Sequence, residues 1–248
     1  MKILGQTNSL PVIEEVPVTR LFRDKTSEES RMDPVIVEHL LSISVNGKPC
    51  CTMTCSPAHL VQLVVGHLVA QGRVSGIDWI DTIELSEDGK KVAVTLVNGK
   101  TLLETPTFAD FSHVLPIVLS PFDKERIFTQ AKALYDNADW FFKTGAAHSS
   151  SLAFDGEVRY RFADVSRHNT VDKLIGQALM DGADLTKAVL FTSGRIPLDM
   201  LSKVVRCGIP IVCSRSAPTT AALELAKKLG ITLIGFVREG RMNVYTLE

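Results

Sequence analysis

The sequence predicts an α/β protein in two parts: a smaller α+β unit over residues 1–140 and an α/β unit with a mostly parallel sheet over residues 141–248. Two observations support this division. Short, continuously apolar runs alternate with helical segments in the second part, which is typical of strands buried on both faces of a parallel sheet. The charge also changes sign, because residues 143–248 carry a net charge of +4 whereas the remainder carries −5 around a total of −1.

The composition is that of an ordinary globular protein, and it argues against several functions. The 248 residues are enough to bury a core, and 45% are hydrophobic while 22% are charged. The nearly neutral net charge argues against binding to nucleic acid or an anionic membrane through overall positive charge. No apolar stretch approaches the ~20 residues of a membrane span, and the N-terminus lacks the order of a signal peptide. We therefore expect a cytoplasmic protein that binds neither nucleic acid nor membranes.

Turn and cap residues place the elements of the first part. About the first 30 residues look loosely structured. Asn46-Gly47 tolerates positive φ and predicts a hairpin, and Ser56-Pro57 suits the first turn of a helix that Gly72 would end. We expect an exposed loop over 23–34, strands over 35–45, 50–54, 80–85, 92–97 and 101–104, and helices over 56–72 and 120–137.

The second part begins with a predicted hairpin around Asp155-Gly156 and continues as alternating helices and strands. Gly208 and Gly230 suit helix C-termini. The alternation implies right-handed crossovers between parallel strands. The expected strands cover 141–154, 158–165, 188–192, 209–214, 231–237 and 242–246, and the expected helices cover 171–180, 197–207 and 218–229.

Segments rich in Arg, Ser, Thr and Gly follow the strands of the second part. In open α/β sheets, ligands bind beyond the carboxyl ends of the strands. Helix N-termini and Arg side chains at such an edge would hold a phosphate or pyrophosphate. Each segment alone is explained as well by helix capping, so the hypothesis requires that they converge. The segments cover residues 164–169, 193–195, 214–220 and 238–241.

Two histidines are candidates for acid–base chemistry. His168 stands just before a predicted helix, and Asp172 would hold its imidazole in one tautomer. His148 stands at a predicted strand end. Both could instead be a helix cap or a satisfied core residue. The other histidines have no polar company in the sequence and are expected to be surface or half-buried residues: His39, His59, His67 and His113.

The order of elements in the second part also fits the three-layer layout of zinc-dependent nucleoside deaminases. Their chemistry needs H-x-E or C-x-E followed by P-C-x-x-C, and neither is present. We therefore expect no zinc site and no hydrolytic deamination by that mechanism. The five cysteines show no C-x-x-C spacing, and an odd number without a secretory signal indicates reduced thiols.

Five motifs in order resemble the FdhD family of accessory proteins for formate dehydrogenase maturation. The resemblance spans essentially the whole chain and is strongest from residue 144 onward. It implies a deaminase-like, three-layer α/β domain without its zinc, joined to a smaller N-terminal domain, in a homodimer. The motifs are Thr144-Gly-Ala-Ala-His148, Asp164-Val-Ser-Arg-His-Asn169 with Val171-Asp-Lys-Leu-Ile-Gly176, Ser193-Gly-Arg195, Ser216-Ala-Pro-Thr219 and Gly235-Phe-Val-Arg-Glu-Gly-Arg-Met-Asn-Val-Tyr-Thr246.

The resemblance also implies a function. The family receives sulfur from a cysteine desulfurase and passes it to the bis-molybdopterin guanine dinucleotide cofactor before the cofactor enters formate dehydrogenase. The pyrophosphates of that cofactor suit the Arg-rich edge, and GDP would be a partial mimic. The expected cofactor-binding residues are His148, Arg167, His168, Asn169, Ser193, Gly194, Arg195, Ser216 and Thr219, with the family's C-terminal segment Phe236, Val237, Arg238, Glu239, Gly240 and Arg241.

The chain departs from this family at one place. Members that transfer sulfur carry a C-x-x-C loop before the second helix, whereas residues 119–124 here contain no cysteine. Only a thiolate can take up and release a sulfane sulfur. Cys55 is the best remaining candidate, since a nearby helix N-terminus would lower its pKa. Free cysteines are usually buried, so the favoured interpretation of Cys50, Cys51 and Cys55 is that they are small core residues.

Three functions therefore stay open. The first is an FdhD-like maturation factor with sulfur transfer. The second is a cofactor-binding chaperone that has lost sulfur transfer. The third is a nucleotide-acting enzyme that uses His168 or His148 as acid or base.

Overall fold

The structure is a computed structural model that describes residues 1–5, 10–23, 27–104 and 122–246. These residues form three sheets and six α-helices. The strands are β1 Lys2–Leu4, β2 Ile13–Leu21, β3 Glu28–Ile36, β4 His39–Val45, β5 Lys48–Cys55, β6 Ile80–Leu85, β7 Lys91–Leu96, β8 His148–Phe154, β9 Glu157–Asp164, β10 Ala188–Thr192, β11 Ile211–Ser214, β12 Thr232–Arg238 and β13 Arg241–Val244. The helices are α1 Leu60–Ala70, α2 Lys124–Asp136, α3 Asp139–Thr144, α4 Arg167–Met180, α5 Leu198–Arg206 and α6 Thr220–Leu229, with short 3₁₀ turns at Ile77–Trp79 and Leu185–Lys187.

The larger sheet is mixed, with strand order β13-β12-β11-β10-β8-β9. Its three central strands, β10, β11 and β12, run parallel, as the helices between them require. β8, β9 and β13 run antiparallel to their neighbours. The prediction of a mostly parallel sheet is therefore wrong outside the centre. Tight turns at Asp155-Gly156 and Gly240 join adjacent strands directly, and such connections produce antiparallel pairs.

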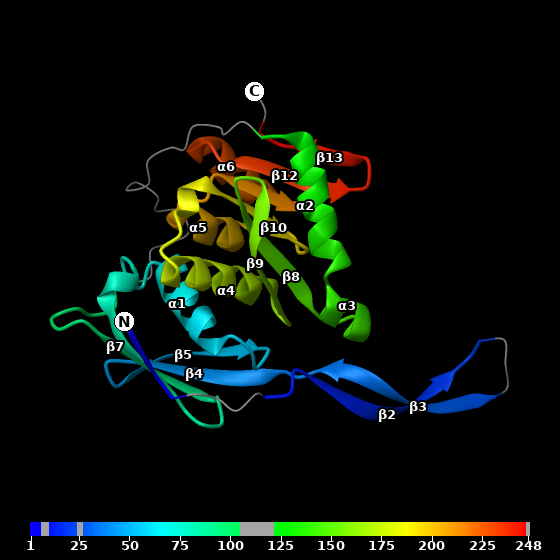
Figure 1. Ribbon diagram of the computed structural model, residues 1–248, viewed down its shortest axis with the longest axis horizontal. Helices are drawn as coiled ribbons and strands as arrows, with labels where there is room; N and C mark the ends of the chain where they lie inside the picture. Colours follow the sequence, from blue (N-terminus) through cyan, green and yellow to red (C-terminus); the bar gives the residue numbers. More distant parts are fainter. Residues whose placement is uncertain (6–9, 24–26, 105–121, 247–248) are drawn as a thin grey trace.

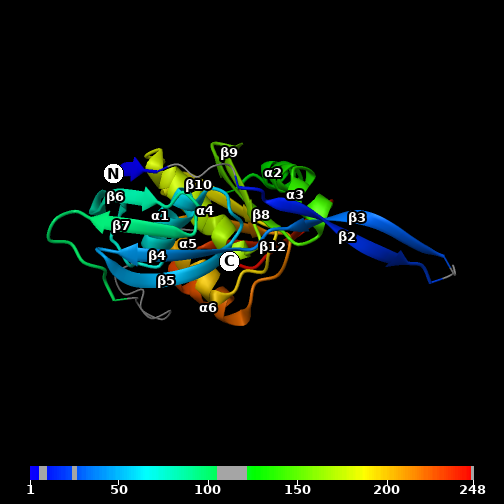
Figure 2. The ribbon, with the colours of Figure 1, turned by 90° about the horizontal axis from the view of Figure 1, so that it is seen from below.

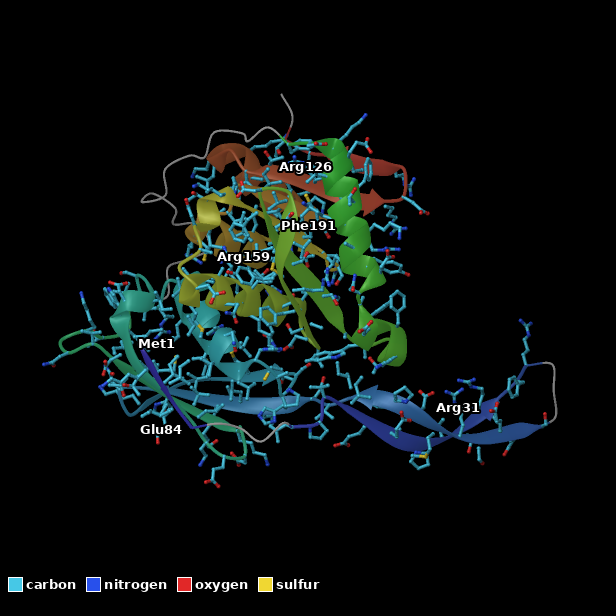
Figure 3. The ribbon with its side chains drawn as sticks, in the orientation of Figure 1. Met1, Arg31, Glu84, Arg126, Arg159 and Phe191 are labelled. Carbon is cyan, nitrogen blue, oxygen red and sulfur yellow. The ribbon has the colours of Figure 1, made fainter. Side chains whose placement is uncertain are left out.

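Helices cover both faces of this sheet (Figure 1). α4, α5 and α6 lie on one face over a large apolar core, and α2 lies on the other over a smaller one. Phe191 belongs to the smaller core and lies inside the molecule in Figure 3. The three-layer arrangement expected from the element order is confirmed for this part of the chain.

A second sheet, with strand order β1-β6-β7-β4-β5, packs through α1 onto α4. Gly66 of α1 and Gly176 of α4 permit this contact. A Cβ atom on Gly66 would lie 1.8 Å from the Asp172 carbonyl oxygen, and one on Gly176 would lie 1.9 Å from that of Gln62. The two helices therefore touch backbone to backbone along a line that we call the α1–α4 seam.

A buried ion pair beside the α1–α4 seam joins α4 to β9. The carboxylate of Asp164 accepts a hydrogen bond from Lys173 Nζ at 2.5 Å, and both side chains are fully buried. The same carboxylate accepts from the Ser56 backbone N–H at 3.1 Å and from the Asn169 amide at 2.9 Å. Ser56 thus links the two parts of the chain instead of capping a helix. Helix α1 begins four residues later, after His59 in a left-handed conformation.

The described part of the N-terminal region is largely strand, contrary to the expected loose structure. Of the exposed loop expected over 23–34, residues 28–34 lie in β3, and residues 24–26 lie outside the described residues. β2 and β3 pair along nine residues each and project from the body as a long hairpin (Figures 1 and 2). Arg31 lies on this arm, far from the core (Figure 3). Its two strands pair only with each other, so neither has the apolar periodicity of a buried face, and the charged sequence resembles a loop. The strand expected over 35–45 is in fact divided between β3 and β4.

Other element boundaries also differ from the predictions. The strand expected over 101–104 is not formed. Residues 141–144 belong to α3 and not to a strand, and α4 begins at Arg167, so residues 167–169 form its first turn. Helix α2 begins after Asp123, whose side chain accepts from the N–H groups of Glu125 and Arg126. Its predicted start at Ser120-Pro121 lies outside the described residues.

Candidate functional site

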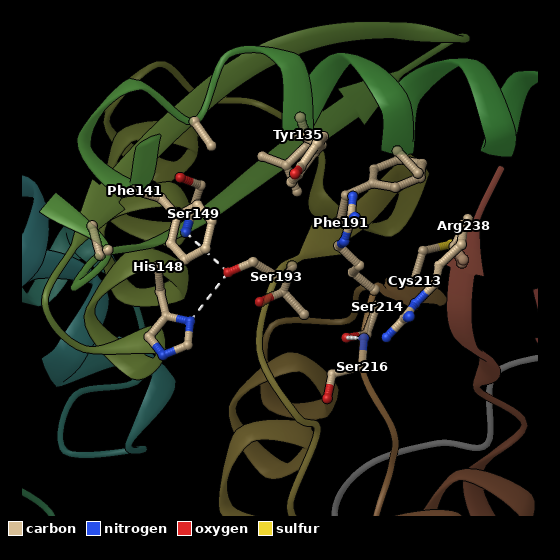
Figure 4. Close-up of a pocket in the computed structure, with 18 of the residues that line it drawn as sticks. Tyr135, Phe141, His148, Ser149, Phe191, Ser193, Cys213, Ser214, Ser216 and Arg238 are labelled. Atoms are coloured by element: carbon tan, nitrogen blue, oxygen red, sulfur yellow. Dashed lines mark hydrogen bonds between the residues drawn. The ribbon is translucent and has the colours of Figure 1, made fainter. Parts of the chain in front are cut away.

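A hollow of about 430 Å³ lies where the central strands of the larger sheet end. β10 and β11 run parallel, so Ser193 and Ser216 leave the sheet at the same edge. β12 brings Arg238 to this edge, and the antiparallel β8 begins there with His148. α2 and α3 cover the hollow (Figure 4). Its volume is within the usual range of ~300–1,000 Å³ for small-molecule sites.

Serine side chains fix the floor of the hollow. Ser193 Oγ lies 3.1 Å from His148 Nδ1 and accepts the Ser149 N–H at 3.1 Å (Figure 4). Ser214 donates to the Gly194 carbonyl oxygen at 2.6 Å and accepts the Ser216 N–H at 2.9 Å. The loops after β10 and β11 are therefore held against each other and present a defined polar surface.

Burial and then the Arg167 guanidinium hold the pKa of His148 below its ordinary value of 6.5. The imidazole is therefore neutral at pH 7 and presents one donor and one acceptor nitrogen. A neutral ring adds no positive charge to the hollow. The cations that line it are instead two arginines.

An aromatic wall faces these cations. Tyr135 from α2, Phe141 from α3 and Phe191 from β10 line the hollow. The Arg215 guanidinium lies 3.7 Å from the centroid of the Tyr135 ring, a cation–π contact. Planar apolar faces beside guanidinium donors suit a ligand that has both an aromatic ring and an anionic group.

A second hollow of about 340 Å³ adjoins the first. Tyr135, Arg215 and Arg238 line both, so the two hollows meet at these residues, and we call the two together the trough. Glu239 and Gly240 line the far end together with residues of α2. The trough has room for a ligand larger than a single ring.

The structure brings together part of the predicted site. His148, Ser193, Ser216, Val237 and Arg238 line the first hollow, and Glu239 and Gly240 line the second. These seven residues come from four separate segments of the chain. The prediction that distant turns meet at one edge of the sheet is confirmed for them.

Three predicted residues lie behind this surface. Arg167 packs on Gly194, where a Cβ atom would lie 2.7 Å from Arg167 Cδ, so glycine makes room for the guanidinium stem. Asn169 is buried and donates to the Thr54 carbonyl oxygen at 2.8 Å. These contacts hold α4 in place, and they do not line either hollow.

His168 is not held by Asp172, contrary to prediction. Its Nε2 lies 3.6 Å from Asp199 Oδ2, whereas Asp172 pairs with Lys203 and His67. Helix α4 begins before His168, so Asp172 faces the α1–α4 seam instead of the sheet edge. His168 lines neither hollow.

The remaining predicted residues lie outside the two hollows. Arg195 and Arg241 are exposed, and Thr219 caps α6 by accepting the Ala222 N–H. Phe236 has a positive φ of 51° at an irregularity of β12, where its N–H donates to the Ser216 carbonyl oxygen at 2.9 Å. The prediction that Arg195, Arg241 and His168 share one binding site with Ser216 is therefore wrong, since these three side chains line neither hollow.

The cysteine prediction also needs correction. Cys55 is fully buried at the end of β5, and burial together with the Asp164 carboxylate raises its pKa to about 12. A lowered pKa was expected from a helix N-terminus, but α1 begins five residues further on. His67, expected to lack polar company, contacts both Asp172 and Cys51. His39 likewise contacts the Gly89 carbonyl oxygen at 2.8 Å, and His113 lies outside the described residues.

Two functional residues were missed by sequence reasoning. Arg215 was visible in its loop as a basic residue after a strand, yet Arg195 and Arg241 gave the same signal. Tyr135 lies in a helix with ordinary apolar spacing, and only the packing of α2 over the sheet edge places it in the hollow. Within the described residues, no three His, Cys, Asp or Glu side chains are grouped as a metal site, and no helix is long and apolar enough to cross a membrane.

These features define a mixed α/β protein with a nucleotide-sized trough at the carboxyl ends of its central strands. Residues 36–248 match the model of the FdhD/NarQ family, and the chain belongs to that family.

Its similarity to curated relatives extends over nearly the whole chain. It is 35% identical to the sulfur carrier protein FdhD of Listeria innocua over 248 residues, which cover 92% of this chain and 94% of that protein. It is 30% identical to the protein of that name from Bacillus subtilis strain 168, covering 92% and 95%. A crystal structure of a formate dehydrogenase accessory protein from Desulfotalea psychrophila matches the fold with a TM-score of 0.84 at 24% identity, covering 96% of this chain and 98% of that one.

Proposed function

We propose that this protein binds the guanine dinucleotide portion of bis-molybdopterin guanine dinucleotide in the trough and serves formate dehydrogenase maturation as a sulfur carrier. The observation that carries the proposal is the pairing of an aromatic wall with Arg215 and Arg238 at the ends of three parallel strands. Strand ends of this kind are where open α/β sheets bind nucleotides.

The residues of the trough fit such a ligand. A guanine ring can stack on Tyr135 or Phe141, and Ser193 and Ser216 offer hydroxyl groups to its polar edge. Arg215 and Arg238 can each donate two parallel hydrogen bonds to a pyrophosphate. When bound, the cofactor supplies its metal and dithiolene chemistry, and the protein's contribution is to hold and orient it. The adjoining second hollow is where we place the portion beyond the diphosphate.

The sulfur-carrier part of the proposal draws on the names of the relatives. A cysteine desulfurase would supply the sulfur, and formate dehydrogenase would receive the finished cofactor. The cytoplasm suits such a protein, since the five cysteines are free thiols. We extend to this chain the homodimer and the deaminase-like fold that the family resemblance implies, and sedimentation of the purified chain would test the dimer.

Calorimetric titration with GDP tests the binding site. We expect saturable binding that weakens about tenfold or more in Arg215→Ala, because a charge-assisted hydrogen bond to phosphate contributes about 1.5–3 kcal/mol. Arg195→Ala is the matched control, since Arg195 is also an exposed arginine that follows a strand but lies outside the hollows. Equal losses in both variants, or no binding by the folded protein, would refute the proposed site.

A cofactor-binding chaperone without sulfur transfer is the second candidate. The observation that favours it is the absence of cysteine from residues 119–124, where the resemblance implies a C-x-x-C loop. Incubation with a cysteine desulfurase and cysteine separates the two functions. A protein that binds GDP but gains no persulfide would be the chaperone.

A further inference from the structure

Three side chains from three different elements meet on the far side of α4 from the trough. Cys51 Sγ on β5 lies 3.8 Å from His67 Nε2 on α1. His67 Nδ1 in turn lies 3.4 Å from Asp172 Oδ2 on α4. A thiol, an imidazole and a carboxylate in this order form the arrangement in which a base activates a nucleophile and an acid orients the base.

The local fold explains how these residues meet. Cys51 pairs with Ile43 beside a bulge in β5, and this register turns its side chain toward the face that α1 covers. His67 lies one residue beyond Gly66 in α1. The glycine contact at the α1–α4 seam brings α1 close enough to α4 for His67 to reach Asp172.

The carboxylate fixes the tautomer of His67. Asp172 is fully buried and ionised, because Lys203 and then His67 hold its pKa below the ordinary value despite its burial. An ionised carboxylate only accepts hydrogen bonds, so His67 must donate its proton from Nδ1. In the neutral ring, Nε2 then carries the lone pair that faces Cys51. Lys203 donates to both oxygens of Asp172, at 2.8 and 2.6 Å, and holds the carboxylate in position.

The Cys51 thiol needs such a base. Burial, and then the neighbouring Cys50, raise its pKa to about 11, so it is protonated at rest. The Arg73 guanidinium acts in the opposite direction and favours the anion. A thiol that is protonated at rest reacts when an adjacent base takes its proton as it attacks.

The other thiols lack this environment. Burial raises the pKa of Cys55, Cys207 and Cys213 as it raises that of Cys51, so the contact with a base is what distinguishes Cys51. In the part of the chain that the structure describes, Cys51 is the cysteine whose sulfur contacts an imidazole. It is also only half-buried, and it lies on β5, the last strand of its sheet.

We propose that Cys51 is the thiol that accepts a sulfane sulfur in this chain, with His67 as its base and Asp172 as the residue that positions the base. The inference rests on the sulfur-carrier part of the proposed function. The Cys51 sulfur attacks the outer sulfur of a donor persulfide while its proton passes to His67 Nε2. The donor S–S bond breaks, and the donor thiolate leaves and takes that proton. Cys51 then carries the persulfide, and no external oxidant or reductant is needed.

Labelling of the full chain by glutathione persulfide tests the proposal. We expect mass spectrometry to find one added sulfur atom on the peptide that contains Cys51, and none there in Cys51→Ser. Cys50→Ser is the matched control on the same strand and should still be labelled. The rate should fall about a hundredfold in His67→Gln, the usual effect of losing a general base. His59→Gln, at an exposed histidine just before α1, should leave the rate unchanged.

Adding imidazole to the solution distinguishes a base from a residue with a purely structural role, because only a missing base can be replaced by free imidazole. It should restore part of the labelling rate of His67→Ala and leave that of the unmodified protein unchanged. Labelling confined to Cys50 or Cys55, an undiminished rate in His67→Gln, or no label on the folded protein would each overturn the inference. GDP titration of the same preparations keeps it separate from the proposed nucleotide site, since Cys51→Ser should bind GDP normally.

Discussion

Charged side chains are exposed at the trough, whereas those beside the α1–α4 seam are buried in ion pairs. At the trough, Arg215 and Arg238 are exposed beside an aromatic wall. Beside the seam, α4 forms two buried ion pairs, one between Lys173 and Asp164 of β9 and one between Asp172 and Lys203 of α5. Burying an unmatched charge is costly, so these lysines must be paired, whereas the exposed arginines of the trough remain available to a ligand. The comparison separates residues that hold the fold from residues that bind.

The largest expected effect comes from breaking one buried pair beside the seam. Lys173→Met leaves the Asp164 carboxylate buried without its counter-charge, so we expect the free energy of unfolding to fall by about 3–5 kcal/mol. Urea denaturation measures this loss. Lys187→Met is the control, because Lys187 pairs with Asp184 on the exposed surface and should cost less than about 1 kcal/mol. Equal losses of unfolding free energy in the two variants would contradict the difference between the buried and the exposed ion pair.

A smaller effect is expected from filling the glycine contact. Gly176→Ala places a methyl group 1.9 Å from the Gln62 carbonyl oxygen, so the helices must separate. We expect a loss of about 1–3 kcal/mol, the usual cost of overpacking. Gly194→Ala is the matched control beside the trough, because its methyl group would meet the flexible stem of Arg167. A larger loss in Gly194→Ala than in Gly176→Ala would contradict this reasoning.

The smallest expected effect is on the pH dependence of stability. Burial lowers the pKa of His148 below its unfolded value of 6.5. The unfolded chain then binds more protons than the folded protein. The stabilisation from a neutral, buried His148 is therefore present above pH 6.5, and it is lost as the pH falls through that value toward the folded pKa. Unfolding between about pH 7.5 and pH 5.5 should show a shallower loss in His148→Gln than in the unmodified protein. A stability that rises on acidification would refute this sign.

Much of the fold could be predicted from local signals. The strands beginning near Ala188, Ile209 and Ile231 were correct in place, because short apolar runs between glycine-ended helices leave few alternatives. The β2–β3 arm could not be predicted in the same way. Its strands are stabilised mainly by pairing with each other, and neither has the apolar periodicity that a buried face imposes.

The candidate site was predictable only in part. His148, Ser193 and Ser216 were predicted at strand ends. This correctly placed them in the hollow, since these strand ends lie at the same edge of the sheet. Position after a strand could not separate Arg238 from Arg241, because that depends on which side of the turn after β12 each side chain occupies. The contact between Cys51 and His67 depends on a bulge and on the spacing of two helices, and neither leaves a signal at the residues themselves.

Helix α4 packs against both the trough and the group formed by Cys51, His67 and Asp172. Arg167, in its first turn, packs on Gly194 behind the trough, and Asp172 orients His67 on the opposite side. Five residues, about 7.5 Å along the helix axis, separate these two positions. Both positions lie on one uninterrupted helix, so a shift of the α4 backbone would change the packing behind the trough and the orientation of His67 together.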